Sequence, residues 1–268
     1  MWSLDQPYIP RAEPLLAGTP IALLVVLAAG AGASAVLVGL QVVPPRLLQI
    51  AGVTAGHGAL LATALAWSGV RSSSSVIAVA LLALAATVAD PAPVSAVAYL
   101  VPALWVLWLA ANGRLATLGL GTPISLQGLF AGALVGAGLS THLLVSASRT
   151  LGVQTRIGHL PEVLAAIAYD VGANVLASEC FFRGALFQRS QRRWSFAAAA
   201  AIATVAYVAR YLLDPLLPKS VELVIGAVFY LALLGVINCW LAWRYESLVP
   251  GLISALVFFA AYRTLAAG

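Results

Sequence analysis

The side chains best suited to chemistry in this sequence lie within a long apolar stretch near residue 180. Glu179 and Arg183 stand four residues apart there, in the order that favours an ion pair along a helix. Charged side chains are costly inside an apolar segment, and they are rare there unless they pair or serve a function. The pattern therefore indicates either a catalytic centre or a structural ion pair, which Arg210 could join.

A second polar group precedes this pair in the same stretch. Asp170, Asn174 and Ser178 follow one another at intervals of four residues. Because residues four apart lie on one side of a helix, these side chains are predicted to form a polar face. The face should turn toward the protein interior, since an unpaired polar group in lipid costs several kcal/mol.

The composition indicates which class of protein contains these residues. The 268 residues are 62% hydrophobic and only 9% charged. Because soluble domains carry about 25% charged residues, we expect an integral membrane protein that has the lipid bilayer as its partner. The net charge of +5 does not predict nucleic-acid binding, since most basic residues lie in connectors and not on one polar face.

Apolar runs of about 20 residues, long enough to cross a bilayer, recur along the chain. Only helices satisfy the backbone polar groups internally over such runs. We therefore predict an all-α fold, a polytopic transmembrane helical bundle of about eight to nine spans. The predicted spans cover residues 18–40, 47–69, 73–89, 93–112, 123–147, 160–187, 195–213, 221–244 and 247–266.

The distribution of polar residues divides the chain into three parts. Residues 1–17 form a polar N-terminal interfacial segment, and residues 18–120 form transmembrane helices with few polar groups. From 121 to 268 the polar residues inside the spans multiply, which indicates the functional core. Lys and Arg are in excess in the connectors on one side, which favours a cytoplasmic N-terminus. The composition is typical of a bacterial protein, so we expect a multi-pass protein of the bacterial inner membrane.

Small residues recur at the spacing of close helix packing. Gly52 and Gly56 form one GxxxG pattern, and Gly128, Gly132 and Gly136 form a double one. Such positions let two helix backbones approach closely. We predict packing within the chain at both places, with dimerisation through one of them as the alternative.

The stretch from Glu179 to Leu186 resembles the second half of the EExxxR signature of the CAAX protease and bacteriocin-processing (CPBP, or Abi) intramembrane metalloproteases. The run from Leu234 to Ser254 is similar to the closing helix pair of that family. The resemblance covers about residues 155–265 and implies a CPBP-like core in the C-terminal half. It also implies a glutamate and a histidine that activate water, and a further histidine and an asparagine that stabilise the oxyanion.

The chain departs from this family pattern at most of the catalytic positions. Serine stands for the first glutamate of EExxxR, arginine for the histidine of FxxxH, and serine and phenylalanine for the last motif, HxxxN. Arginine stays protonated and cannot accept a proton, and serine is no base by itself. The resemblance therefore implies a degenerate centre in which Glu179 and Arg183 form a structural ion pair. The degenerate motif positions are Ser178, Arg210, Ser254 and Phe258.

Three functional hypotheses follow. The first is a pseudoenzyme that acts by binding, as a subunit, assembly factor or regulator of a membrane protein complex, with another integral membrane protein or a second copy as partner. The alternative is an active CAAX-type peptidase with an altered centre, in which Glu179 is the base and Asp170 or His142 assists. The third is a channel or transporter with a path lined by the polar residues.

No metal or cofactor site is predicted. Cys180 and Cys239 lie in apolar runs and are expected to behave as small buried hydrophobic residues. No cluster of Cys and His has the spacing of a metal site. Single histidines in apolar helices are poor indicators of a ligand, so no pigment or haem is assigned to His57, His142 or His159.

Overall fold

The chain forms helices wherever the sequence is continuously apolar. The computed structural model describes residues 15–89, 93–151, 154–155, 159–212 and 221–266. Every predicted span coincides with a helical segment in these ranges, which confirms the predicted all-α bundle. The described residues add one small antiparallel strand pair, β1 (Gln154–Thr155) with β2 (Leu265–Ala266).

The helices group into two compact units. The amino-terminal unit comprises residues 18–117 and 157–181, and the carboxy-terminal unit comprises residues 1–17, 118–156 and 182–268. The sequence-based division at residues 17 and 120 stays a prediction, and residues 1–14 of the predicted interfacial segment lie outside the described residues.

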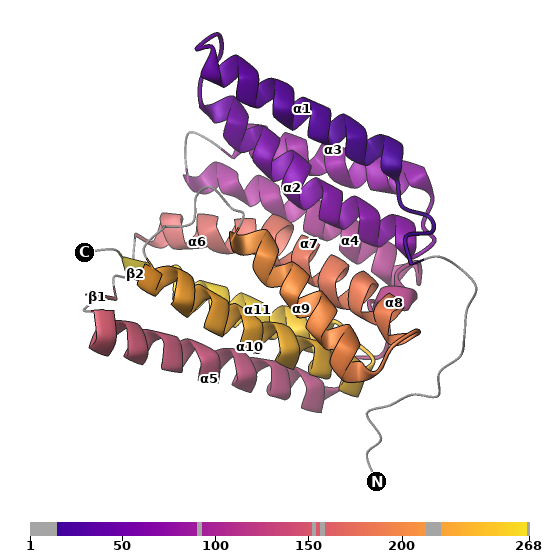
Figure 1. Ribbon diagram of the computed structural model, residues 1–268, viewed down its shortest axis with the longest axis vertical. Coiled ribbons are helices and arrows are strands. Elements are labelled where there is room, and N and C mark those ends of the chain that lie inside the picture. The colour runs from indigo at the N-terminus through magenta and orange to yellow at the C-terminus, as the bar shows by residue number, and fades with distance from the viewer. Residues whose placement is uncertain (1–14, 90–92, 152–153, 156–158, 213–220, 267–268) are drawn as a thin grey trace. The chain divides into compact units, whose positions relative to one another are not determined.

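In the amino-terminal unit, α1 packs on α2 and α2 packs on α3 (Figure 1). Arg46, the first residue of α2, donates from Nη2 to the Thr87 carbonyl at 2.7 Å, near the end of α3. This bond satisfies a carbonyl that has no partner inside its own helix. The elements of the unit are α1 (Ile21–Gly39), α2 (Arg46–Trp67), α3 (Ser72–Val88), η1 (Pro93–Tyr99), α4 (Leu100–Ala111), α6 (Leu160–Tyr169), η3 (Asp170–Asn174) and α7 (Val175–Glu179).

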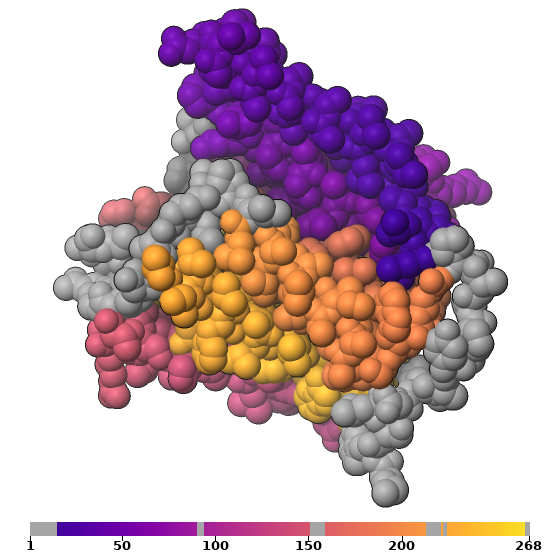
Figure 2. Space-filling view, in the orientation of Figure 1, coloured from indigo at the N-terminus to yellow at the C-terminus, as the bar shows by residue number. Residues whose placement is uncertain are grey.

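In the carboxy-terminal unit, α11 packs against α5 and α10, and α10 packs against α9 (Figure 1). Figure 2 shows α9 and α10 side by side on one face. Exposed apolar residues of these two helices, such as Val205 and Phe229, suit contact with lipid. The helices of the unit are α5 (Leu126–Leu151), α8 (Gln188–Gln191), α9 (Phe196–Leu212), α10 (Val221–Tyr245) and α11 (Val249–Tyr262). Two further elements cross the limits of the units, η2 (Ala116–Leu118) and η4 (Cys180–Phe187).

Several of these helices have the length that is needed to cross a bilayer. Among the described residues, 6 helices are long and apolar enough to cross a membrane. Three shorter apolar helices, α3, α9 and α11, account for the remaining predicted spans. The chain is therefore a multi-pass membrane protein, with a lipid bilayer as its environment.

The glycines of α5 form the tightest helix contact in the carboxy-terminal unit. A side chain at Gly132 would collide with the Pro250 carbonyl oxygen of α11, and one at Gly136 would come within 2.7 Å of the Ser254 carbonyl oxygen. The predicted packing of the double GxxxG within the chain is confirmed, because these glycines let the two backbones meet.

The GxxxG pair of α2 behaves differently from the one in α5. Gly52 and Gly56 are exposed, and a side chain at either would meet nothing within 4 Å among the described residues. The prediction of packing within the chain at this pair is wrong. The spacing alone does not show which side of a helix faces the interior.

We expect the replacement Gly132→Ala to lower the free energy of unfolding by about 1–3 kcal/mol, because the new methyl group overpacks the contact with α11. Gly138→Ala on the same helix is the matched control, since a side chain at Gly138 meets nothing within 4 Å. Thermal unfolding in detergent micelles measures both changes. Equal midpoints for the two variants would contradict the tight α5–α11 contact.

Candidate functional site

The candidate residues lie on one long helical run from Leu160 to Gln191, 32 residues in length. The run is not a plain α-helix as predicted, because η3 and η4 are π-helical. A π-helix bonds residue i to residue i+5, which shifts the following side chains relative to an α-helix. Such turns recur at functional sites, and nothing in the sequence signalled them here.

The predicted polar face begins in the first π-helical stretch. Asn174 donates from Nδ2 to Asp170 Oδ1 at 2.9 Å, so these two side chains do lie on one side of the helix. Both are buried, as is Ser178 one turn later. The Ser178 hydroxyl has no hydrogen-bond partner among the described residues.

Glu179 and Arg183 are among the most deeply buried charged residues that the structure describes, with 1% and 0% of their surfaces exposed. The guanidinium carbon of Arg183 lies 3.9 Å from the centre of the Tyr207 ring on α9. A cation over the face of an aromatic ring is stabilised by the ring's negative face, by about 2 kcal/mol when water is excluded. Tyr207 therefore helps to keep the Arg183 charge in the protein interior.

Tyr207 belongs to no motif in the sequence, and only the periodic pattern of α9 indicates that it is buried. The buried positions of α9 recur every three or four residues and include Ala203, Thr204, Tyr207 and Tyr211. Arg210, which was aligned with the family's histidine, lies half-buried beside this face, with its guanidinium 4.5 Å from the Tyr211 ring centre. The predicted participation of Arg210 in an ion pair with Glu179 and Arg183 stays a prediction.

Aromatic rings continue from Tyr207 through the interior of the carboxy-terminal unit. Neighbouring ring centres are 5.1 to 6.1 Å apart, and the rings meet edge-to-face, stacked or tilted. These spacings are typical of favourable aromatic pairs. The members of this aromatic cluster are Phe182, Tyr207, Tyr211, Phe259, Phe258 and Tyr230.

The last two degenerate motif positions lie on α11. Phe258 belongs to the aromatic cluster, and Ser254 is fully buried against Gly136 of α5. The Ser254 hydroxyl has no hydrogen-bond partner in the part of the chain that the structure describes. Asn238 of α10 donates to the Gly251 carbonyl at 3.1 Å, one turn before Ser254. This bond joins the predicted closing helix pair.

The amino-terminal unit contributes a buried histidine. His57 Nε2 lies 2.7 Å from the hydroxyl oxygen of Tyr169, and the Tyr169 ring meets that of Tyr99 edge-to-face. Gly172 lets the helix approach η1, because a side chain there would collide with the Tyr99 carbonyl. Tyr169 precedes Glu179 by ten residues, or about 15 Å of helix rise. His57 is therefore bound at the level of Asp170 and not at that of Glu179.

His142, the histidine proposed to assist Glu179, has a different partner. It lies on the exposed side of α5, and its Nδ1 is 2.7 Å from the Tyr230 hydroxyl oxygen of α10. His159 is exposed at the start of α6. Among the described residues, no three His, Cys, Asp or Glu side chains are grouped so as to hold a metal ion. Cys180 and Cys239 are both buried, and neither forms a disulfide bond in the part of the chain that the structure describes.

Residues 160–260 match the model of the type II CAAX prenyl endopeptidase Rce1-like family. This range contains Glu179, Arg183 and every motif position chosen from the sequence, so the predicted resemblance is confirmed over that region. No curated protein and no solved structure matches the chain. The chain is thus a multi-pass membrane protein with a region similar to CAAX prenyl endopeptidases.

A double-mutant cycle with Arg183→Met and Tyr207→Leu should give a coupling free energy of about 1–2 kcal/mol, because each change removes one half of the same buried contact. Tyr207→Phe keeps the ring face and should keep most of that coupling. The measurement is reversible unfolding in micelles for the single and double variants. Strictly additive losses would show that Arg183 draws no stabilisation from the ring.

Proposed function

We propose that the protein is a non-catalytic relative of the type II CAAX prenyl endopeptidases. It acts by binding, as a subunit, assembly factor or regulator of a membrane protein complex. Its partner is another integral membrane protein or a second copy of the chain. The observation that carries the proposal is the aromatic cluster. Phe258, which stands at a motif position, belongs to this cluster, and the Tyr207 ring of the cluster contacts the Arg183 guanidinium.

The chemistry of peptide hydrolysis explains why this cluster matters. A general base must take a proton from water, and hydrogen-bond donors must face the developing oxyanion. A phenylalanine ring offers neither a base nor a donor, and a guanidinium that stays protonated cannot be the base. Packed rings and a buried cation favour a rigid structural core in the carboxy-terminal unit over a site that admits water.

The buried charges also suit a structural role and not a catalytic one. A buried ion pair contributes little net stability, but it can determine which packing arrangement forms. We propose that Glu179 and Arg183 act in this way, with Arg210 as a further participant. The polar face of Asp170, Asn174 and Ser178 then serves to fix how the long helix is oriented.

We also propose that the protein lies in a bacterial inner membrane with its N-terminus in the cytoplasm. More basic residues lie in the connectors on that side than on the other, as is typical of cytoplasmic loops. Arg11 lies outside the described residues. The others on this side are Arg71, Arg114, Arg189, Arg192, Arg193 and Arg244.

Purified protein in proteoliposomes should not cleave prenylated CAAX peptides above the rate of empty vesicles. The variant Glu179→Gln should behave identically, because no water-activating step depends on that carboxylate. An active type II CAAX endopeptidase, reconstituted in the same way, verifies the assay. Cleavage by the wild type that disappears in Glu179→Gln would contradict the proposal and establish the alternative, a peptidase with an altered centre.

Gentle extraction from native membranes, followed by native mass spectrometry, should release the chain in a complex of defined stoichiometry. Chemical cross-linking before extraction should capture the same partner, and Glu179→Gln should retain it. A parallel purification from cells without the tagged chain removes adventitious proteins. Recovery of the chain only as a monomer, with and without cross-linking, would rule out the binding role.

A further inference from the structure

The turn between α8 and α9 carries a dense positive charge. Three arginines fall within residues 189–193, and no aspartate or glutamate lies between Glu179 and Asp214 in the sequence. Arg192 is exposed and Arg193 is half-buried, and neither side chain forms an ion pair or a hydrogen bond with any described residue. Their positive charge is therefore available to an anionic partner.

Helix α10 brings a further arginine to this turn. The Phe196 ring at the start of α9 meets the Trp243 ring edge-to-face, with the ring centres 5.7 Å apart, so the end of α10 lies against the start of α9. Arg244 comes directly after Trp243, and Glu246 supplies one negative charge two residues later, which balances only one of the arginines. The resulting basic patch consists of Arg189, Arg192, Arg193 and Arg244.

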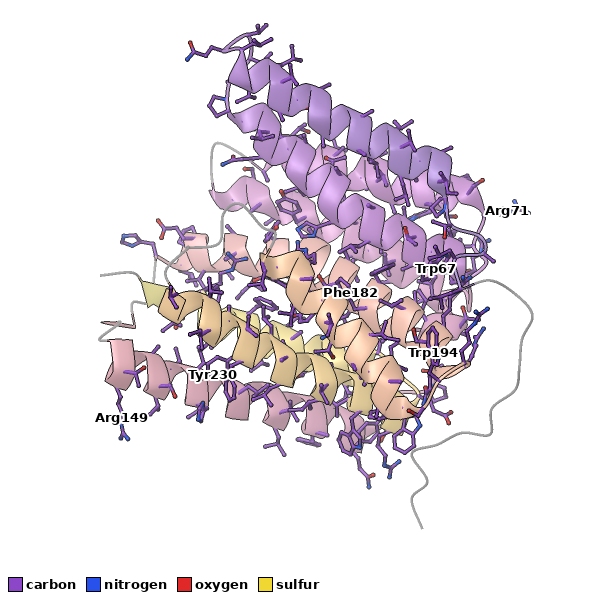
Figure 3. The ribbon with its side chains drawn as sticks, in the orientation of Figure 1. Trp67, Arg71, Arg149, Phe182, Trp194 and Tyr230 are labelled. Carbon is purple, nitrogen blue, oxygen red and sulfur yellow. The ribbon has the colours of Figure 1, made fainter. Side chains whose placement is uncertain are left out.

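The basic patch lies where apolar helices end. One candidate span covers Leu160–Gln191, directly before Arg192, and another covers Val224–Tyr245, which has Arg244 in its last turn. The ends of spanning helices lie near the lipid headgroups, where tryptophan is also enriched. Trp194 is 43% exposed beside the patch, and Figure 3 shows it near the start of α9. Arginine and tryptophan side chains are thus combined as they are at a headgroup layer.

An apolar surface extends from the patch along α9 and α10, which lie side by side in Figure 2. The large exposed side chains of the two helices include Ile202, Val205, Val236 and Trp240. Trp240 precedes Arg244 by four residues, so both lie on one side of α10. A molecule that contacts this surface together with the patch must be apolar along most of its length and anionic at one end.

We propose that the basic patch binds the headgroup of an anionic phospholipid, whose acyl chains lie along the exposed apolar side chains of α9 and α10. A guanidinium and a phosphate pair through two parallel hydrogen bonds, and Arg192 and Arg193 supply these donors. A soluble anion would gain nothing from the apolar surface, and a zwitterionic lipid carries a positive group that the patch repels. The site is independent of the proposed non-catalytic role, since neither Glu179 nor Arg183 takes part in it.

Native mass spectrometry of the delipidated protein tests this site by titration with phosphatidylglycerol and with phosphatidylcholine. We expect the first phosphatidylglycerol to bind more tightly than phosphatidylcholine by about 25-fold, or about 5-fold for each of two arginines near an anionic headgroup. The double variant Arg192→Gln/Arg193→Gln should bind both lipids about equally. Arg149→Gln is the matched control and should bind as the wild type does. Arg149 is also exposed, and Figure 3 shows it at the opposite end of the carboxy-terminal unit from Trp194.

Equal affinities of the wild type for the two lipids would overturn the proposal, and so would a preference that survives in the double variant. Soluble glycerophosphoglycerol should not displace the lipid at equal concentration, and displacement would overturn the proposal in favour of a site for a free phosphodiester. A double variant that keeps its lipid preference but loses a protein partner would assign the patch to an acidic protein surface instead. The double variant should unfold at the same temperature as the wild type, because both arginines lie on a turn outside the core.

Discussion

The contact between the Arg183 guanidinium and the Tyr207 ring makes the interior of the carboxy-terminal unit possible. A fully buried cation in an apolar bundle requires a polarisable or negative neighbour, and the ring face lies 3.9 Å from it. Tyr207 in turn contacts Phe182 and Tyr211, so the position of the charge determines how the rings beyond it pack. Substitution at one end of the cluster is therefore expected to disturb packing as far as Phe258.

The position of α11 is determined by its contact with α5, whose glycines have no side chains that would hold the two backbones apart. Gly132 and Gly136 let the Pro250 and Ser254 carbonyls approach the α5 backbone. Asn238 adds a hydrogen bond from α10 to Gly251. Because lipid gives no hydrophobic drive for helices to associate, close backbone packing and hydrogen bonds of this kind have to supply it.

The helices and the family resemblance could be read from the sequence, because apolar runs and the EExxxR-like spacing are local patterns. The hydrogen-bond partners of the polar residues could not be predicted from such local patterns. His142 was placed with Glu179 as a candidate, yet its hydrogen bond goes to Tyr230, 88 residues away. The π-helical stretch from Asp170 to Asn174 contains Gly172, whose close approach to Tyr99 is a tertiary contact that no local pattern predicts. Gly52 and Gly56 show that a packing motif does not by itself identify the side on which a helix packs.

The shortness of α11 has a consequence for the membrane itself. Its 14 residues span about 21 Å, less than a typical hydrocarbon thickness of about 30 Å. Such hydrophobic mismatch thins the adjacent bilayer or draws its headgroups inward, at a cost of fractions of a kcal/mol per Å. The protein should therefore partition into the thinner regions of its membrane.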